Sequence, residues 1–246
     1  MPTAVAIRAS AMPAATIVGP PDPESAKSRN APDVLLLEYT RALLTCMLFV
    51  PDNASILHIG LGAGTIPDFI HRRFPHARQR VVELNPEVIA VAGRFFDLPR
   101  SARLEVVQDD GLHHLRIARD AFDLLVFDAF HAEGAASQLT TAAAFELAQK
   151  RLKPGGWLVN NAWGSDALLL RAITTALQER FAEVHQLSVR MHSNVILIAG
   201  SPATRTSLSA LRERADVLGA RMPLDLAPWL KQLAAGLQRR PTLVSG

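Results

Sequence analysis

Several kinds of residue are scarce in this chain, and each scarcity excludes something. The 246 residues include a single cysteine, Cys46, so no internal disulfide can form, which fits a reducing compartment. Only 4 of the 26 basic residues are lysines, and the arginines are scattered rather than gathered into the basic stripe expected of a nucleic-acid-binding protein. We therefore expect a cytoplasmic protein without a nucleic-acid partner.

A long uninterrupted apolar segment is also missing. The apolar run Val34–Val50 is broken by Glu38 and Arg41 and is too short to span a bilayer. The first residues lack a basic stretch followed by a long apolar one, so we expect no signal peptide. No internal repeat is visible, and we expect no membrane partner.

What the chain does contain predicts one main domain with a flanking segment on each side. Hydrophobic residues make up 49% of the sequence, enough to bury a full core. Residues 1–33 are rich in alanine, proline and serine and show no periodicity, so we expect an irregular N-terminal arm. Residues 34–200 have the pattern of an α/β domain, and residues 201–246 that of a C-terminal helical extension.

Strands alternate with helices in the central segment, which is the pattern of right-handed βαβ units. It predicts an α/β fold with a mostly parallel seven-stranded sheet, helices on both faces and a closing antiparallel hairpin. The expected strands are Ser55–Ile59, Arg80–Leu84, Leu104–Val107, Leu124–Phe127, Trp157–Asn160, Val184–Val189 and Val195–Ala199. The expected helices are Val34–Phe49, Gly64–Phe74, Pro86–Phe96, Leu112–Ala118, Thr141–Leu152 (ended by Lys153–Gly156), Asp166–Arg180, Leu208–Leu218 and Leu226–Leu237.

Glycines follow the first expected strand, at Gly60, Gly62 and Gly64. In an open α/β sheet, ligands bind beyond the carboxyl ends of the strands, where the strand order reverses. Glycines at alternate positions allow a tight turn and a close approach of ligand to backbone, although a plain connecting turn is the alternative. A dinucleotide-binding loop usually reads G-x-G-x-x-G; here the third glycine comes one residue early, which favours a loop that binds S-adenosylmethionine.

Acidic residues follow the next two strands. Glu83 lies 19 residues past Gly64, where a carboxylate can accept hydrogen bonds from both ribose hydroxyls, although an ordinary exposed glutamate is the alternative. The third strand is followed by Asp109, Asp110 and Gly111, and a carboxylate there can accept the exocyclic amine of adenine. Asp110 is also placed to cap the following helix, and the two roles are compatible.

The fourth strand is followed by Asp128, which we expect at the carboxyl end of the sheet, where the ligand binds. A carboxylate there can hold or deprotonate an amine, and the alternative is an aspartate that caps a loop turn. His131 offers a second polar contact, although a single loop histidine is more often solvated. Four successive strand ends with glycines or acids are more specific together than any one alone, and they predict a nucleoside-binding enzyme.

These motifs resemble those of the spermidine synthase (polyamine aminopropyltransferase) family over about residues 35–200. The resemblance implies a Rossmann-like fold of the S-adenosylmethionine-dependent methyltransferase type. It also implies a transferase of polyamine biosynthesis that moves an aminopropyl group from decarboxylated S-adenosylmethionine to a small-molecule amine acceptor, with no metal. The segments that carry it are Ile56–Gly64, Val81–Ile89, Gln108–Gly111, Phe122–Asp128 and Leu152–Gly156.

The resemblance extends to the roles of single residues. By this resemblance Asp128 is the base that removes a proton from the attacking amine, Glu83 binds the ribose and Asp110 binds the adenine. Tyr39, about one helix before the first strand, resembles the family's tyrosine that lines the amine site.

The sequence departs from the family around the acceptor. His131 replaces a second aspartate, which weakens a site for a dication, and Ala63 stands where the glycine loop commonly carries an aspartate that meets the cofactor's amine. Thr40 and Arg41 follow Tyr39, where the family usually has histidine and glutamate. Intact S-adenosylmethionine is therefore an alternative co-substrate. A small-molecule methyltransferase and a non-catalytic nucleoside-binding protein stay open as functions, as does a homodimer as the oligomeric state.

Overall fold

The computed structural model describes residues 35, 37–131, 134–135, 137–190, 194–203, 205–219, 221–222 and 224–238. The expected N-terminal arm, residues 1–33, lies outside the described residues.

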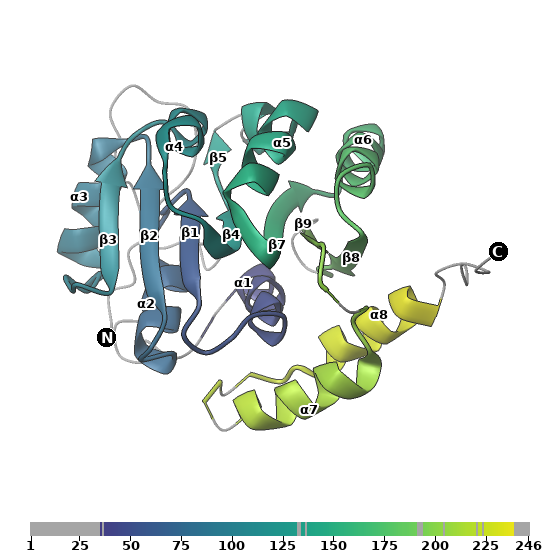
Figure 1. The fold of residues 1–246 in the computed structure, drawn as a ribbon. Coiled ribbons are helices and arrows are strands. Elements are labelled where there is room, and N and C mark those ends of the chain that lie inside the picture. Colours follow the sequence, from purple (N-terminus) through teal and green to yellow (C-terminus); the bar gives the residue numbers. More distant parts are fainter. Residues whose placement is uncertain are drawn as a thin grey trace.

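A seven-stranded sheet forms the centre of the molecule, in the order β3-β2-β1-β4-β7-β9-β8 (Figure 1). The strands from β3 to β7 run parallel, and β9 is antiparallel to both of its neighbours. The predicted fold, with its closing hairpin, is confirmed. The strands are β1 (Ser55–Ile59), β2 (Arg78–Glu83), β3 (Leu104–Gln108), β4 (Phe122–Phe127), β7 (Leu152–Trp163), β8 (Glu183–Ser188) and β9 (Asn194–Gly200).

Helices cover both faces of the sheet. One face packs against α1, α2, α7 and α8, and the other packs against α4, α5 and α6, which lie together along the upper side in Figure 1. A third, smaller cluster joins α3 to β2 and β3. The helices are α1 (Glu38–Leu44), the 3-10 helix η2 (Thr45–Leu48), α2 (Thr65–Arg73), α3 (Pro86–Phe95), α4 (Gly111–Ile117), α5 (Ala142–Arg151), α6 (Ala167–Gln178), α7 (Leu208–Gly219) and α8 (Ala227–Gln238).

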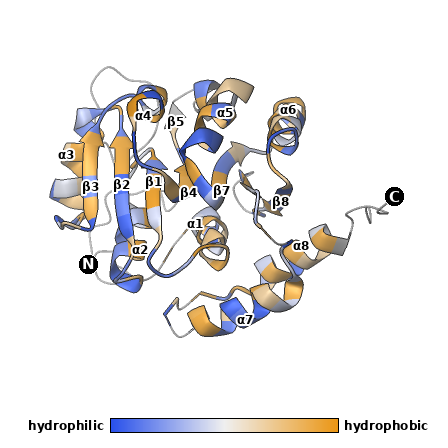
Figure 2. Ribbon diagram, in the orientation of Figure 1, coloured by the Kyte–Doolittle hydropathy of each residue, from blue (hydrophilic) through white to orange (hydrophobic). Residues whose placement is uncertain are grey.

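The central strands are apolar because both of their faces are covered. In β4, Leu124 and Val126 belong to one hydrophobic cluster while Leu125 and Phe127 belong to the cluster on the opposite face. A parallel strand buried on both sides therefore reads as a continuous apolar run rather than an alternating one. Figure 2 shows the same distribution, with hydrophobic residues along the central strands.

The prediction of a helix from Val34 was wrong at its beginning. The helix α1 starts at Glu38, because Leu37 has extended backbone angles and its carbonyl accepts the hydroxyl of Thr40 at 2.7 Å. Leu35 precedes the helix and is buried in the core. An apolar side chain reaches the core from an extended segment as well as from a helix, so the apolar pattern did not decide between them.

The strand expected at Trp157–Asn160 is longer at both ends, because β7 runs from Leu152 to Trp163 and so includes the segment Lys153–Gly156 that follows α5. The register with β4 shifts between the pair Phe122–Leu152 and the pair Leu124–Trp157. This irregularity carries the surplus residues of β7, and Gly155 allows it with a φ of 78°. A short pair of strands, β5 (Phe130–His131) and β6 (Gly134–Ala135), and the 3-10 helix η3 (Ser137–Thr140) were not predicted.

The two C-terminal helices belong to the core of the domain. Leu211 and Leu218 of α7 and Trp229 of α8 are buried in the same cluster as α1 and α2. The side chain of Gln232 accepts the backbone N–H of Ser188 at 2.8 Å and donates to its carbonyl at 3.1 Å. This amide therefore satisfies two backbone groups on the edge strand β8.

A carboxylate before β1 anchors these helices. Asp52 accepts hydrogen bonds from Arg214 and Arg221, and Arg214 also donates to the carbonyl of Val50 at 3.0 Å. Burial alone would raise the pKa of Asp52, but the hydrogen bonds from the two guanidinium groups outweigh it and hold the pKa below its ordinary value. The ionised form is therefore favoured by folding.

Replacing Asp52 with asparagine is expected to lower the free energy of unfolding by about 1–2 kcal/mol, the range of partly exposed charge-assisted hydrogen bonds. The depressed pKa means that this contribution is present above the unfolded-state pKa near 4 and is lost as the pH falls through the folded-state pKa. Urea unfolding at pH 7 and pH 3 measures both effects. Asp216→Asn, which removes an exposed charge on α7, is the control, and equal stability of the two variants at pH 7 would contradict the role of Asp52.

Candidate functional site

The candidate site lies where the strand order reverses, between β1 and β4. The glycine loop leaves the carboxyl end of β1, and Asp128 leaves the carboxyl end of β4 beside it. The N–H of Asp128 donates to the carbonyl of Ile59 at 3.0 Å, and the N–H of Gly60 donates to the carbonyl of Val82 at 2.9 Å. These bonds hold the three strand ends in contact at the expected place.

The glycines of the loop are needed for different reasons. Gly60 has a φ of 101°, and a Cβ there would lie 2.4 Å from the backbone oxygen of Asp128, so the close approach of two strand ends requires it. Gly62 has a φ of 54°, but a Cβ there would meet no described atom within 4 Å. A Cβ on Gly64 would meet a side chain, Leu98, at 2.7 Å. Among the three glycines of this loop, Gly62 is therefore the one that borders open space on the described surface.

Glu83 is held in place by the loops on either side of it. Its carboxylate accepts the N–H of Leu61 through one oxygen and the N–H of Asn85 through the other, each at 2.9 Å. Each carboxylate oxygen has further acceptor capacity, so both ribose hydroxyls could still be bound. The arrangement fixes the carboxylate beside the glycine loop, and its ribose role stays a prediction.

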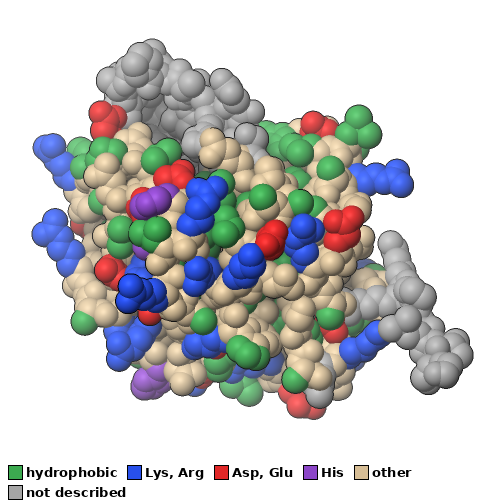
Figure 3. All heavy atoms as spheres, turned by 45° about the horizontal axis from the view of Figure 1, so that its top comes forward, with side chains coloured by type: hydrophobic (Ala, Val, Ile, Leu, Met, Phe, Trp, Pro, Cys, Tyr) green, Lys and Arg blue, Asp and Glu red, His purple; other side chains and the backbone are tan. Residues whose placement is uncertain are grey.

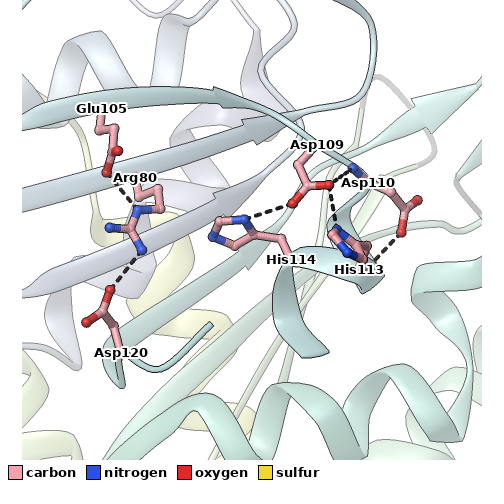
Figure 4. Close-up of polar contacts among 7 residues, drawn as sticks. All are labelled: Arg80, Glu105, Asp109, Asp110, His113, His114 and Asp120. Carbon is pink, nitrogen blue, oxygen red and sulfur yellow. Dashed lines mark hydrogen bonds and ion pairs between the residues drawn. The ribbon is translucent and has the colours of Figure 1, made fainter. Parts of the chain in front are cut away.

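Asp109 and Asp110 do different things at the end of β3 (Figure 4). The carboxylate of Asp109 contacts the Nδ1 atoms of His113 and His114 at 2.8 and 3.2 Å and accepts the N–H of Asp110. Burial alone would raise its pKa, but the hydrogen bonds of the two histidines lower it. Asp110 accepts the N–H of His113 at 2.8 Å through Oδ1, so its role as the cap of α4 is confirmed.

Of these two residues, Asp110 keeps more acceptor capacity for a ligand. Its second carboxylate oxygen makes no hydrogen bond to the residues that the structure describes. Gly111 has a packing reason of its own, because a Cβ there would lie 2.3 Å from the Cγ2 of Ile59. The adenine roles of Asp109, Asp110 and Gly111 stay predictions.

Asp128, which follows β4, and Tyr39, in α1, are close enough to interact electrostatically. Burial raises the pKa of the Asp128 carboxyl, and the hydrogen bond from Asn161 offsets part of that rise. Burial also raises the pKa of the Tyr39 phenol, and the negative charge of Asp128 raises it further. A carboxylate with raised basicity, with a neutral phenol within electrostatic range of it, is suited to hold an amine and to accept its proton.

Two asparagines of the site were missed in the sequence. The side chain of Asn161 donates to Oδ1 of Asp128 at 2.8 Å, and the side chain of Asn194 donates to Oδ1 of Asn161 at 3.0 Å. Both are almost fully buried, with 3% and 7% of their surface exposed. One feature of the sequence could have indicated Asn161. Asn160 and Asn161 follow the apolar residues of the strand that was expected to end at Asn160, and ligands bind at such strand ends.

The positions that depart from the family lie on α1, the glycine loop and β5. Thr40 is buried and donates to the carbonyl of Leu37 just before its helix, while Arg41 is half-buried on the same helix. Ala63 is half-buried in the glycine loop. His131 lies in β5, where its backbone pairs with Gly134. The predicted roles of Tyr39 and His131 in substrate binding stay predictions.

The described surface carries mixed charge. On the face shown in Figure 3, Lys and Arg side chains are interspersed with acidic and neutral ones and form no single continuous stripe. Within the described ranges, no cluster of three or more histidines, cysteines or acids has the geometry to bind a metal ion. None of the described helices is long and apolar enough to cross a membrane.

The chain is similar in sequence to polyamine aminopropyltransferases of bacteria. The polyamine aminopropyltransferase of Chromobacterium violaceum is 35% identical over 213 residues, which cover 85% of this chain and 81% of the relative. The polyamine aminopropyltransferase of Neisseria meningitidis is 30% identical over 217 residues, which cover 86% and 82%.

Solved structures give the same fold. A probable spermidine synthase from Corynebacterium glutamicum is 27% identical with a TM-score of 0.67, covering 90% of this chain and 86% of that one. Human methyltransferase-like protein 13, solved in complex with SAH, has a TM-score of 0.71 at 22% identity, covering 76% and 93%, and shows the fold alone. The family described as the spermine/spermidine synthase domain matches residues 38–201, which include every strand of the main sheet and every residue of the candidate site. The chain therefore belongs to the spermine/spermidine synthase family.

Proposed function

We propose that this chain is an aminopropyltransferase that binds a nucleoside of the S-adenosylmethionine type and transfers its aminopropyl group to a small-molecule amine. The observation that carries the proposal is the carboxylate of Asp128, which lies next to the glycine loop, accepts a hydrogen bond from Asn161 and interacts electrostatically with Tyr39. The two polyamine aminopropyltransferases, similar over more than four fifths of their length, support the same reaction. In this proposal residues 34–200 carry the nucleoside site, and the helices α7 and α8 of the C-terminal segment, which begins at residue 201, extend the core of the same domain.

In the proposed reaction the chain's residues bind, orient and move one proton. The glycine loop with Gly62 receives the nucleoside, Glu83 accepts its ribose hydroxyls and Asp110 accepts its adenine amine. The co-substrate supplies a carbon activated by a neighbouring sulfonium. The amine nitrogen forms a bond to that carbon as the carbon–sulfur bond breaks, and the sulfur keeps the bonding electrons. Asp128 accepts the proton that the nitrogen loses, because a protonated amine has no lone pair for attack.

We propose the decarboxylated nucleoside as the co-substrate, as the named relatives support. Isothermal calorimetry with decarboxylated S-adenosylmethionine, intact S-adenosylmethionine and methylthioadenosine tests this choice, followed by turnover with a panel of mono- and diamines. We expect the decarboxylated form to bind more tightly than the intact form and to be consumed with an amine. Preference for the intact form would favour the methyltransferase alternative, on which Ala63 in the loop also bears. Binding without turnover of any amine would overturn the proposal.

Replacing Glu83 with alanine is expected to weaken methylthioadenosine binding by about tenfold or more, because a charge-assisted hydrogen bond is worth about 1.5–3 kcal/mol. Calorimetry measures the affinity, and urea unfolding shows whether the loss of the bonds to Leu61 and Asn85 has destabilised the fold. Glu87→Ala is the matched control, because it removes the same charge from an exposed position in the first turn of α3. Equal affinities of a folded Glu83→Ala variant and of this control would reject the ribose assignment.

A further inference from the structure

Three polar side chains form a row across adjacent strands beside the site. The last register pair of β4 and β7 is Phe127 with Asn160, so Asp128 and Asn161 are the next residues along these parallel strands. Trp163 lies two residues after Asn161 in β7, so the two side chains are on the same face of the sheet. The register of β7 and β9 pairs Trp163 with Asn194, which places Asn194 on that face as well. The observed bonds run along this row, from Asn194 to Asn161 and from Asn161 to Asp128.

The row matters because the end of an aspartate side chain turns easily. The torsion that orients an aspartate carboxylate or an asparagine amide is broad, so neither group holds its direction without a partner. The Asn161 amide fixes one oxygen of Asp128, but the Asn161 amide is equally free to turn. Asn194 removes that freedom, because its donation to Oδ1 of Asn161 leaves the N–H₂ group of Asn161 directed at Asp128.

We infer that Asn161 and Asn194 are positioning residues: together they hold one oxygen of Asp128 so that the other oxygen faces the attacking amine. This inference rests on the proposed function, in which Asp128 accepts the proton. With this inference the site includes residues of β7 and β9, in addition to the strand ends that meet at the glycine loop. Neither asparagine needs to touch the substrate for this role.

The same bond also influences the charge of Asp128. A hydrogen bond donated to a carboxylate favours its ionised form, which opposes the effect of burial. The titratable group on α1 that interacts electrostatically with Asp128 is Tyr39, whose raised phenol pKa keeps it neutral in the pH range of interest. No described charged side chain makes an ion pair with Asp128. Loss of the Asn161 amide should therefore raise the pKa of Asp128 and make it a base only at higher pH.

The decisive variant is Asn161→Leu, which removes the hydrogen bonds and nearly keeps the volume. Misplacement of a catalytic group by about 1 Å can cost about 100-fold, so we expect kcat to fall by about 10–100-fold. The acidic limb of the pH profile should move up by about one unit, and methylthioadenosine affinity should stay within about twofold.

Asn160→Leu is the matched control, because Asn160 is a buried amide on the opposite face of the same strand and its Nδ2 has no hydrogen-bond partner among the described residues. We expect it to keep kcat and the pH profile. Equal loss of kcat in both leucine variants would show that any change in this strand is harmful, and it would overturn the inference.

A double-mutant cycle tests whether Asn194 acts through Asn161. Asn194→Leu alone should lower kcat and move the acidic limb in the same direction as Asn161→Leu, by a smaller amount. In the Asn161→Leu background it should add no further loss, because the amide that it orients is gone. If the losses of kcat in Asn161→Leu and Asn194→Leu were fully additive, Asn194 would not act on Asp128 through Asn161.

A carbon-13 NMR titration of the Asp128 carboxyl separates this inference from the proposed function. The titration needs no turnover, so it reports on the row even in a protein without aminopropyltransferase activity. We expect the pKa of Asp128 to be higher in Asn161→Leu than in the wild-type protein or in the control Asn160→Leu. Failure of the unchanged chain to turn over any amine would reject the proposed function alone. An Asp128 titration that Asn161→Leu leaves unmoved would reject the positioning role.

Discussion

Replacing Asp128 with asparagine is expected to lower turnover by about 10²–10⁴-fold, the usual range for the loss of a general base. The substitution keeps the shape of the side chain and removes its charge and basicity. The new amide would use its oxygen to accept the N–H of Asn161, as Oδ1 of Asp128 does now. Its own N–H₂ group would then face the attacking amine, so the site would present a donor where the reaction needs an acceptor.

Methylthioadenosine affinity should change little in Asp128→Asn, because Glu83 and Asp110 are proposed to hold the ribose and the adenine. Turnover of the decarboxylated nucleoside with an amine measures the first effect, and calorimetry measures the second. Asp216→Asn, an exposed charge removal on α7, should leave both unchanged. A variant that keeps its activity would remove Asp128 from the mechanism, and a joint loss of activity and affinity would show that Asp128 supports the nucleoside site instead.

The sequence allowed most strands to be predicted because the sheet is buried on both faces. The strand β1 was predicted with its observed bounds, and β4 within two residues, since an apolar run between polar or glycine-rich segments has one natural place in such a fold. The order of the last two strands was not predictable in the same way. A hairpin signal shows that β8 and β9 pair, but it does not show that β9 is the one inserted beside β7.

Because the position of β9 beside β7 was not predicted, the asparagines of these two strands were not recognised as part of the site. Glu83, Asp110 and Asp128 each follow a strand directly, so the rule that ligands bind at strand ends is enough to find them. Asn161 and Asn194 reach Asp128 only through the register of β4, β7 and β9. A single sequence does not contain that register. The position of Asn194 at the beginning of an antiparallel strand, rather than at the end of a parallel one, also falls outside the rule.

The packing reasons for Gly60 and Gly111 escaped prediction for a similar cause. Both were interpreted as parts of a ligand-binding surface because they follow strands. The structure adds an independent constraint, because a Cβ on either residue would collide with an atom of a neighbouring strand end. Among the loop glycines, only Gly62 borders open space on the described surface. A test of the nucleoside site by substitution in this loop should therefore be made at Gly62.

Replacing Gly62 with leucine is expected to weaken methylthioadenosine binding by about 100-fold or more, equivalent to about 2.7 kcal/mol. The φ of 54° costs a residue with a side chain about 1–2 kcal/mol of stability, which a domain of this size can lose without unfolding. A Cβ at this position would meet no described atom within 4 Å, so the leucine side chain would extend into the open space where the ligand should approach the backbone. Calorimetry measures the affinity, and urea unfolding measures the stability.

Two alanine variants separate obstruction from strain. Gly62→Ala has nearly the same backbone cost as Gly62→Leu and a much smaller side chain, so it should be equally destabilised and should bind better. Gly60→Ala should be destabilised more than either, because its Cβ would lie 2.4 Å from the backbone oxygen of Asp128 and a strand end must move. An affinity of Gly62→Leu equal to that of the protein without the substitution would mean that nothing approaches the loop from the open side. The glycine loop would then be only a connecting turn, and the nucleoside would bind elsewhere on the protein.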